Sequence, residues 1–222
     1  MTPAEIVHVL VVWTPFLAGG FLWNILISLV AMAIGTVFGA VLARLRLSGR
    51  KSLARMGLAV TELTRNIPTF VFLFYLAFLI PVEFKVSDEI YSFPAWLKAS
   101  LALSVAVVGF VSDNLLVAWQ HWRNANHSAA LLFVPSWTMY LVIIVMASST
   151  ASVIGVGEIV SRCNVVIAAV SGEEMMVWVY IYAIGYFFGL CFPLNWAMGR
   201  VKKRLLAHVG GTSAQKCGEC ER

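Results

Sequence analysis

Five long apolar stretches constrain the fold of this chain more than any other feature of its sequence. A helix needs about 20 mainly apolar residues to cross the hydrocarbon core of a bilayer. The stretches of roughly this length are residues 19–43, 67–82, 97–119, 135–157 and 175–199. The second is the shortest, and it begins beside Pro68, which suits the first turn of a helix. The pattern predicts an all-α integral membrane protein with five transmembrane helices.

A sixth apolar segment, residues 5–17, is shorter and contains Pro15. Proline has no backbone N–H and removes one hydrogen bond from the interior of a helix. We therefore expect this segment to form an interfacial helix at the membrane surface and not a further span.

The composition agrees with a protein that lipid surrounds. Of the 222 residues, 60% are hydrophobic and only 12% are charged, whereas soluble domains carry about 25% charged residues. The mean hydropathy is +0.86.

The length suits one domain, predicted at residues 1–206. A polar cytoplasmic tail that we expect to be unstructured follows at residues 207–222. The first twenty residues contain no Lys or Arg, so they lack the basic region of a cleaved signal peptide.

The distribution of basic residues predicts the orientation of the spans. With five spans, the segments after the first, third and fifth lie on one side of the membrane, and only Lys85, Lys98 and Arg162 lie on the other. The first side holds the remaining 13 of the 16 Lys and Arg residues: Arg44, Arg46, Arg50, Lys51, Arg55, Arg65, Arg123, Arg200, Lys202, Lys203, Arg204, Lys216 and Arg222. Basic residues concentrate on the cytoplasmic side of membrane proteins. We therefore predict the amino terminus outside and the carboxyl terminus in the cytoplasm. Because the net charge of +5 comes from these flanking clusters, it does not indicate nucleic-acid binding.

Three segments carry a resemblance to a known family. Residues 16–48 are similar to the first transmembrane helix of that family and to the Leu- and Arg-rich segment that follows it. Residues 61–81, TELTRNIPTFVFLFYLAFLIP, resemble the most specific signature, E-L-x-R-G-T-P followed by an apolar helix that ends in Pro. Glu62, Leu63, Arg65 and Pro68 fall on its fixed positions, while Asn66-Ile67 replaces the usual Gly-Thr. The family is that of the polar amino-acid permeases of type I ABC importers.

The third matching segment is residues 134–159, VPSWTMYLVIIVMASSTASVIGVGEI. It resembles the family segment that begins Leu-Pro and ends near Ile-Gly-Val-x-Glu-Leu. Pro135 and Gly155 match that pattern, and Glu158 takes its acidic position. The three segments cover about half of the chain, in the order in which the family has them.

The resemblance implies both a function and a set of partners. The chain is expected to be half of the translocation pathway of an ATP-driven importer for polar amino acids or similar small solutes, in the bacterial inner membrane. A second permease subunit, two ATP-binding cassette ATPase subunits and a periplasmic substrate-binding protein would complete the complex. The chain itself is expected not to be an enzyme, since it has no G-x-x-x-x-G-K-[ST] loop for ATP.

One departure from the family concerns the loop between the third and fourth spans. In the family this cytoplasmic loop contains an E-A-A…G motif and forms a coupling helix that docks on the ATPase. Here only Trp119 to Val134 connect the two spans, and the motif is absent. Trp119, Trp122, Arg123 and Leu131 are the candidate residues for coupling to the ATPase. Whether this short loop couples is left open. An accessory half that pairs with an intact permease, and an unrelated small membrane structural subunit or enzyme, are the alternatives.

Two further groups of polar residues are candidates for the transport pathway. Asp113 and Asn114 fall in the third span, where an acid is costly and should face a partner or a wet cavity. The alternative places Asp113 in the cytoplasmic interface because the span ends early. Ser148, Ser149 and Thr150 lie in the fourth span and either line a polar path or allow close helix packing.

Several other residues have a structural interpretation beside the functional one. Glu62 and Arg65 either form a local i,i+3 ion pair or have a structural role near the ATPase-facing surface. Glu158 is predicted at a solvated outer rim, with contact to a docking binding protein as the alternative. Gly35 and Gly39 form a G-x-x-x-G pattern that indicates close helix packing.

The sequence predicts neither a catalytic site nor a bound cofactor. The four His residues lack metal-ligand spacing with carboxylates, so no metal site is expected. Cys217 and Cys220 have the spacing of half a zinc site or of a redox pair, but no second pair completes it, and two free thiols are expected. The sequence does not identify the solute. It also does not show whether the two permease halves are identical.

Overall fold

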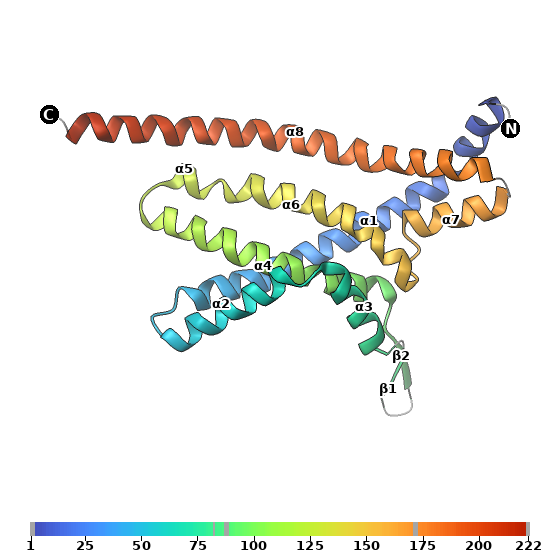
Figure 1. The fold of residues 1–222 in the computed structure, drawn as a ribbon, viewed down its shortest axis with the longest axis horizontal. Helices are drawn as coiled ribbons and strands as arrows, with labels where there is room; N and C mark the ends of the chain where they lie inside the picture. The colour runs from blue at the N-terminus through green and yellow to red at the C-terminus, as the bar shows by residue number, and fades with distance from the viewer. Residues whose placement is uncertain (1–2, 82, 87–88, 171–172, 221–222) are drawn as a thin grey trace.

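The computed structural model describes residues 3–81, 83–86, 89–170 and 173–220 and consists mainly of helices (Figure 1). In chain order the elements are α1 (Pro3–Arg46), α2 (Lys51–Asn66), α3 (Thr69–Leu79), β1 (Glu83–Val86), β2 (Glu89–Ser92), α4 (Ala95–Arg123), α5 (His127–Ala130), α6 (Phe133–Ala147), the 3₁₀ helix η1 (Ser148–Ile154), α7 (Ile159–Val170) and α8 (Glu173–Cys220).

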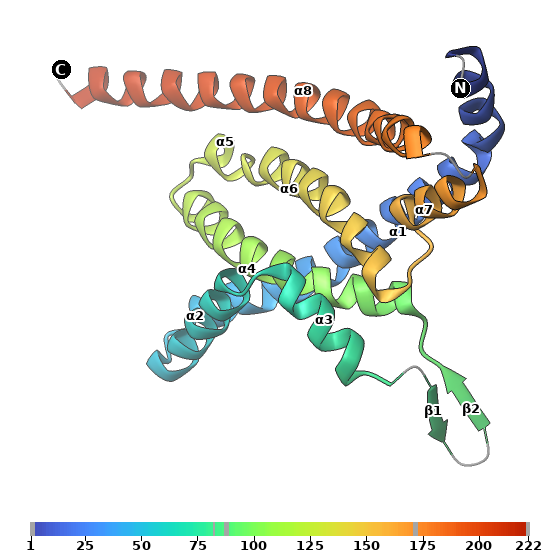
Figure 2. The ribbon, with the colours of Figure 1, turned by 45° about the vertical axis from the view of Figure 1, so that its right-hand side comes forward.

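The elements are arranged so that the chain passes repeatedly between two ends of the molecule. The turn between α1 and α2, the short helix α5 and the end of α8 lie toward the left in Figures 1 and 2. The amino terminus, the β1–β2 hairpin, α7 and the start of α8 lie toward the right. The segments that the charge partition assigns to the cytoplasm thus gather at the left, which we call the basic end. Which side of a membrane this end faces stays a prediction.

Four of the five expected spans are helices long and apolar enough to cross a membrane. Within the described residues these helices are Ala4–Arg46, Ala95–Arg123, His127–Ile154 and Met175–Ala207. The second expected span, 67–82, contains only the 11-residue helix α3. At 1.5 Å per residue, α3 is about 16 Å long, roughly half the thickness of a hydrocarbon core. A fifth crossing here would need α2 and α3 together, with a break between them at Pro68.

Residues 5–17 do not form a helix of their own, and their expected position at the membrane surface stays a prediction. α1 runs without interruption through Pro15. Its first turns are packed, because Val9, Trp13 and Leu17 belong to an apolar cluster with α7 and α8. Polar contacts add to this packing: the Tyr186 hydroxyl donates to the Thr14 carbonyl at 3.3 Å. These contacts hold the first turns of α1 against α7 and α8, and α1 bends after them (Figure 2).

Three other elements differ from the sequence-based expectation. The β1–β2 hairpin, paired antiparallel from Glu83–Ser92 to Val86–Glu89, departs from an all-α fold. Helix α7 occupies a segment to which no element was assigned. The polar tail predicted at 207–222 is helical as far as Cys220, because α8 continues through it. The side chains of Cys217 and Cys220 lie outside the described part of the structure.

Helix α1 is central to the packing. One apolar cluster joins it to α3, α4, α6 and η1 through residues such as Met32, Leu103 and Val107, and the second joins it to α7 and α8. The G-x-x-x-G prediction is confirmed. A Cβ atom at Gly35 would collide with Val107, and one at Gly39 would lie 2.7 Å from the Val111 Cβ. α1 and α4 therefore approach as closely as their backbones allow.

Candidate functional site

A polar pocket of about 550 Å³ opens where α2 ends and α3 begins, against α4 and α6. Its lining brings together Arg65 and Pro68 of the signature with Asp113 and Asn114, the candidate pathway residues of the third span. The rest of the lining is Thr64, Asn66, Ile67, Thr69, Ala106, Phe110 and Tyr140. We refer to this cavity as the polar pocket. Its volume lies within the range of small-molecule binding sites.

Pro68 creates the opening of the polar pocket. The residue before a proline is pushed out of the helical conformation, and Ile67 is accordingly extended, with φ −85° and ψ 126°. α2 therefore ends at Asn66, and α3 starts one residue after the proline. The break exposes backbone and polar side chains to the cavity, which an uninterrupted apolar helix would not do.

Asp113 is held by two arginines. Its Oδ1 lies 2.6 Å from Nη1 of Arg46 at the end of α1, and its Oδ2 lies 3.0 Å from Nη1 of Arg65 at the end of α2. Arg65 thus pairs with Asp113 and not with Glu62, an exposed residue outside the pocket lining, so the local i,i+3 interpretation was wrong. The carboxylate of Asp113, within α4, thus connects the ends of α1 and α2.

Buried hydroxyls reinforce the contact between α2 and α4. Thr61 and Ser112 lie 2.8 Å apart between their hydroxyl oxygens, and both side chains are buried. Arg46 also donates to the Ser112 hydroxyl at 3.1 Å.

One wall of the pocket is formed by α4 and α6. Asn114 donates to the carbonyl of Phe110 in its own helix. The ring of Phe110 in turn stacks on Tyr140 of α6 at 3.9 Å between centroids, so this wall of the pocket is firmly packed.

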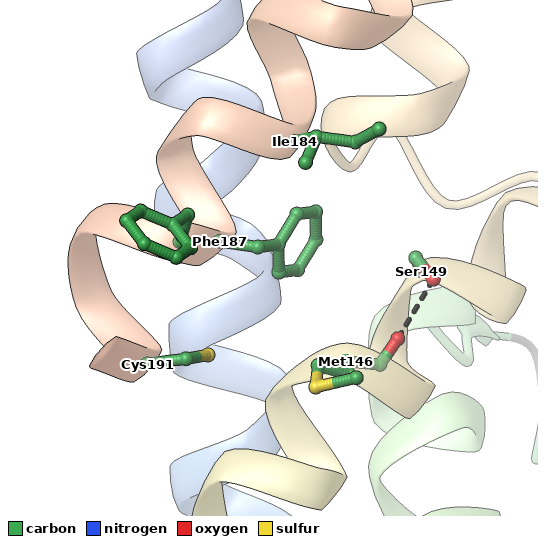
Figure 3. Close-up of a pocket in the computed structure, with 6 residues that line it drawn as sticks. Met146, Ser149, Ile184, Phe187 and Cys191 are labelled. Carbon is green, nitrogen blue, oxygen red and sulfur yellow. Dashed lines mark hydrogen bonds between the residues drawn. The ribbon is translucent and has the colours of Figure 1, made fainter. Parts of the chain in front are cut away.

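The hydroxyl-bearing residues of the fourth span do not join the polar pocket. Ser148, Ser149 and Thr150 each donate a hydrogen bond to a carbonyl three residues earlier. Ser149 lines a different cavity of about 420 Å³, between α6 and α8 (Figure 3). The rest of that lining is apolar or contains sulfur: Met146, Ile184, Phe187, Phe188 and Cys191. These hydroxyls are therefore satisfied locally, and the pathway role predicted for them stays a prediction.

The expectation of a solvated rim at Glu158 was wrong, since the residue is 0% exposed. Its carboxylate caps the start of α7, with Oε2 accepting from the Val160 N–H and Oε1 from the Ser161 N–H, both at 3.0 Å. Asn24 of α1 donates to Oε2 at 3.0 Å. Burial raises the pKa of the Glu158 carboxyl above its usual value, and these hydrogen bonds act in the opposite direction. Buried in this way, Glu158 is not available to a docking protein.

Asn24 ties this buried site together. Its amide also donates to the Ser148 hydroxyl at 2.9 Å, and its carbonyl accepts from the Ile159 N–H at 3.1 Å. The chain reaches Glu158 through Gly155, which has a φ of +84°. This left-handed conformation favours glycine. It explains the glycine of the Ile-Gly-Val pattern, while Pro135 lies buried near the start of α6.

A third cavity lies at the basic end, between α4, α5 and α6. It has a volume of about 430 Å³, and all four candidate coupling residues line it: Trp119, Trp122, Arg123 and Leu131. We call it the coupling groove. Its other lining residues are apolar, and Trp122 is 57% exposed. Trp122 packs edge-on against His127, which lies in the single turn of α5.

Two polar residues of these sites were missed by the sequence analysis. Arg46 was counted only as a flanking charge, although it makes the shorter ion pair to Asp113. Asn24 lies inside the first expected span, and a polar amide at that depth was the available signal. No group of His, Cys, Asp and Glu suited to a metal ion occurs among the residues that the structure describes.

Comparison with known proteins identifies the fold. No protein-family model matches the sequence, and no curated protein matches it significantly. The structure is similar to a chain of a crystal structure described as that of "an amino acid ABC transporter with histidines". The TM-score is 0.72 at 16% sequence identity, and the match covers 88% of this chain and 96% of the other. The chain therefore has the fold of that amino acid ABC transporter chain.

Proposed function

We propose that this chain is a transmembrane permease subunit of an ATP-driven importer for polar amino acids or similar small solutes. It would form half of the translocation pathway in a bacterial inner membrane, beside a second permease subunit. ATP would be hydrolysed on a separate ATPase, and a periplasmic binding protein would deliver the solute. The main support is the structural similarity to a chain of an amino acid ABC transporter, which covers 88% of this chain and 96% of the other.

Two local features support the proposal independently of the overall fold. The signature residues Arg65 and Pro68, matched from sequence, lie at one polar pocket with Asp113 and Asn114. Broken helices that place polar groups beside a cavity are a recurring feature of transporter binding sites. The basic end, in addition, gathers the loops expected to face the cytoplasm.

The coupling groove is the proposed contact with the ATPase. A docking surface needs exposed apolar anchors, and Trp119, Trp122 and Leu131 are each about half exposed around one apolar cavity. The Arg44 guanidinium lies over the ring of Trp119, 5.9 Å from its centre, so α1 contacts this side of the groove.

Trp122→Ala is expected to weaken association with the ATPase about thirtyfold or more. An aromatic anchor at the centre of an interface contributes about 2 kcal/mol or more, and each 1.4 kcal/mol is a factor of about ten in affinity. The ATPase retained by the tagged chain in detergent would be titrated for both forms. Trp178→Ala is the matched control, because Trp178 is similarly exposed but lies at the start of α8, at the opposite end.

A second candidate function is an accessory half that pairs with an intact permease. It is favoured by the length of the connection between α4 and α6, in which α5 has only four residues. In that case Trp122→Ala would leave ATPase association unchanged, and disruption of the partner permease's loop would abolish it. Unchanged ATPase binding by Trp122→Ala would thus contradict the role of the coupling groove and favour this alternative.

A further inference from the structure

We propose that the polar pocket binds the carboxylate group of a zwitterionic or anionic solute, and that Arg65 is the residue that binds it. The inference rests on the proposed function and specifies its substrate class. The argument depends on which charges of the pocket are already neutralised and which are accessible.

The charge balance at the pocket is positive. Asp113 is the only acidic side chain in the lining, and Arg65 is the only basic one. Arg46, outside the lining, also pairs with Asp113 at 2.6 Å. Two guanidinium groups thus share one carboxylate, which leaves a surplus of one positive charge. A cationic solute would meet an acid that is already doubly paired, whereas a carboxylate would meet an unbalanced guanidinium.

The two ion pairs of Asp113 are unequal. The Arg46 side chain is 13% exposed and makes the 2.6 Å contact, while the Arg65 side chain is 64% exposed and makes the 3.0 Å contact. Ion pairs that solvent reaches contribute little to stability. Arg65 can therefore turn from Asp113 to a solute at small cost. Arg46 remains on Asp113, so the aspartate is never left as a lone charge near the membrane.

The remaining lining suits a small polar solute. A guanidinium presents a planar fork of N–H donors that matches both oxygens of a carboxylate. Asn66, Thr69 and Asn114 add amide and hydroxyl groups within the same cavity, and Phe110 stacked on Tyr140 supplies an aromatic wall. The two other cavities described above are poorer matches, since the one at Ser149 and the coupling groove are almost wholly apolar.

The test measures solute binding to the full chain, captured with its ATPase and placed in lipid nanodiscs. The probes are the 20 standard amino acids and their α-carboxamides, which keep the amino group and lose the carboxylate. We expect at least one amino acid to bind, and its amide to bind at least tenfold more weakly, because a hydrogen bond to a charged group is lost. An amide that binds as tightly as its acid, or no binding by any probe while the ATPase is present, overturns the inference.

Variants assign the effect to Arg65. Arg65→Gln is expected to weaken binding of the acid about tenfold or more and to leave the amide unaffected, and Arg65→Lys to restore part of the affinity. Asp113→Asn is expected to maintain or strengthen binding, since it releases Arg65. Arg55→Gln, on the same helix but outside the pocket lining, is the control. The assignment is contradicted if Asp113→Asn, with a normal elution profile, loses binding of the acid while Arg65→Gln binds it as tightly as the wild-type chain. If the captured complex contains no ATPase, the proposed function itself is contradicted. This outcome is distinct from the binding results that contradict only the inference.

Discussion

Replacing Gly35 with leucine is expected to destabilise the bundle by about 3 kcal/mol or more, at the upper end of the effect of overpacking a core. A Cβ atom at this position would lie 2.8 Å from the Ser104 carbonyl oxygen and would collide with the side chain of Val107. Both belong to α4, and neither is the flexible end of a long side chain. α1 and α4 would have to separate, which would disrupt the apolar cluster around Met32 and Leu103.

The measurement is the melting temperature of the detergent-solubilised chain, followed by fluorescence-detected gel filtration. A loss of this size corresponds to roughly 10 °C for a chain of about 200 residues. Gly189→Leu is the matched control, because Gly189 also lies within a long apolar helix but has no heavy atom within 4 Å of the added Cβ position. Equal melting temperatures for Gly35→Leu and Gly189→Leu would contradict the close packing of α1 on α4.

Replacing Glu158 with alanine is expected to cost about 3 kcal/mol or more, because each buried donor left without an acceptor costs about 1–3 kcal/mol. The carboxylate accepts from the backbone N–H groups of Val160 and Ser161 and from the Asn24 amide. Since the site is fully buried, water does not readily replace the lost acceptors. α7 would lose its cap and the hydrogen bond from the Asn24 amide of α1 to the carboxylate.

The matched variant for this site is Glu158→Gln. It has almost the same shape and keeps one acceptor oxygen, but its NH₂ group faces a donor, so an intermediate loss of melting temperature is expected. If Glu158 were instead a solvated contact for a docking protein, both variants would melt like the wild-type chain. That result would contradict the buried cap.

The long helices and the close packing at Gly35 and Gly39 were predictable from sequence because both depend on local patterns. An apolar run of about 20 residues has few alternatives to a helix in lipid. A pair of glycines four residues apart marks one face of that helix, as Gly35 and Gly39 do. The start of a helix beside Pro68 was also predicted, but the helix α2 that precedes it was not.

The polar contacts were less predictable because they join residues far apart in the chain. Glu158 follows an apolar helix and precedes another, a position typical of an exposed loop, and only the approach of Asn24 buries it. The role of Arg46 depends on α4 returning Asp113 to the end of α1. Pro15 was expected to interrupt the apolar segment 5–17, whereas α1 continues through it and its first turns contact α8.

The proposal that the chain is the membrane subunit of an ATP-driven importer is tested most directly by transport. The complex captured through this chain would be reconstituted into proteoliposomes loaded with ATP or, as the control, with ADP. The vesicles would be placed in periplasmic extract with an isotope-labelled mixture of amino acids, and their contents would be measured by mass spectrometry. We expect at least one amino acid to accumulate above its external concentration with ATP and not with ADP. Equal contents with ATP and ADP, for every amino acid in the mixture, would contradict the proposed function.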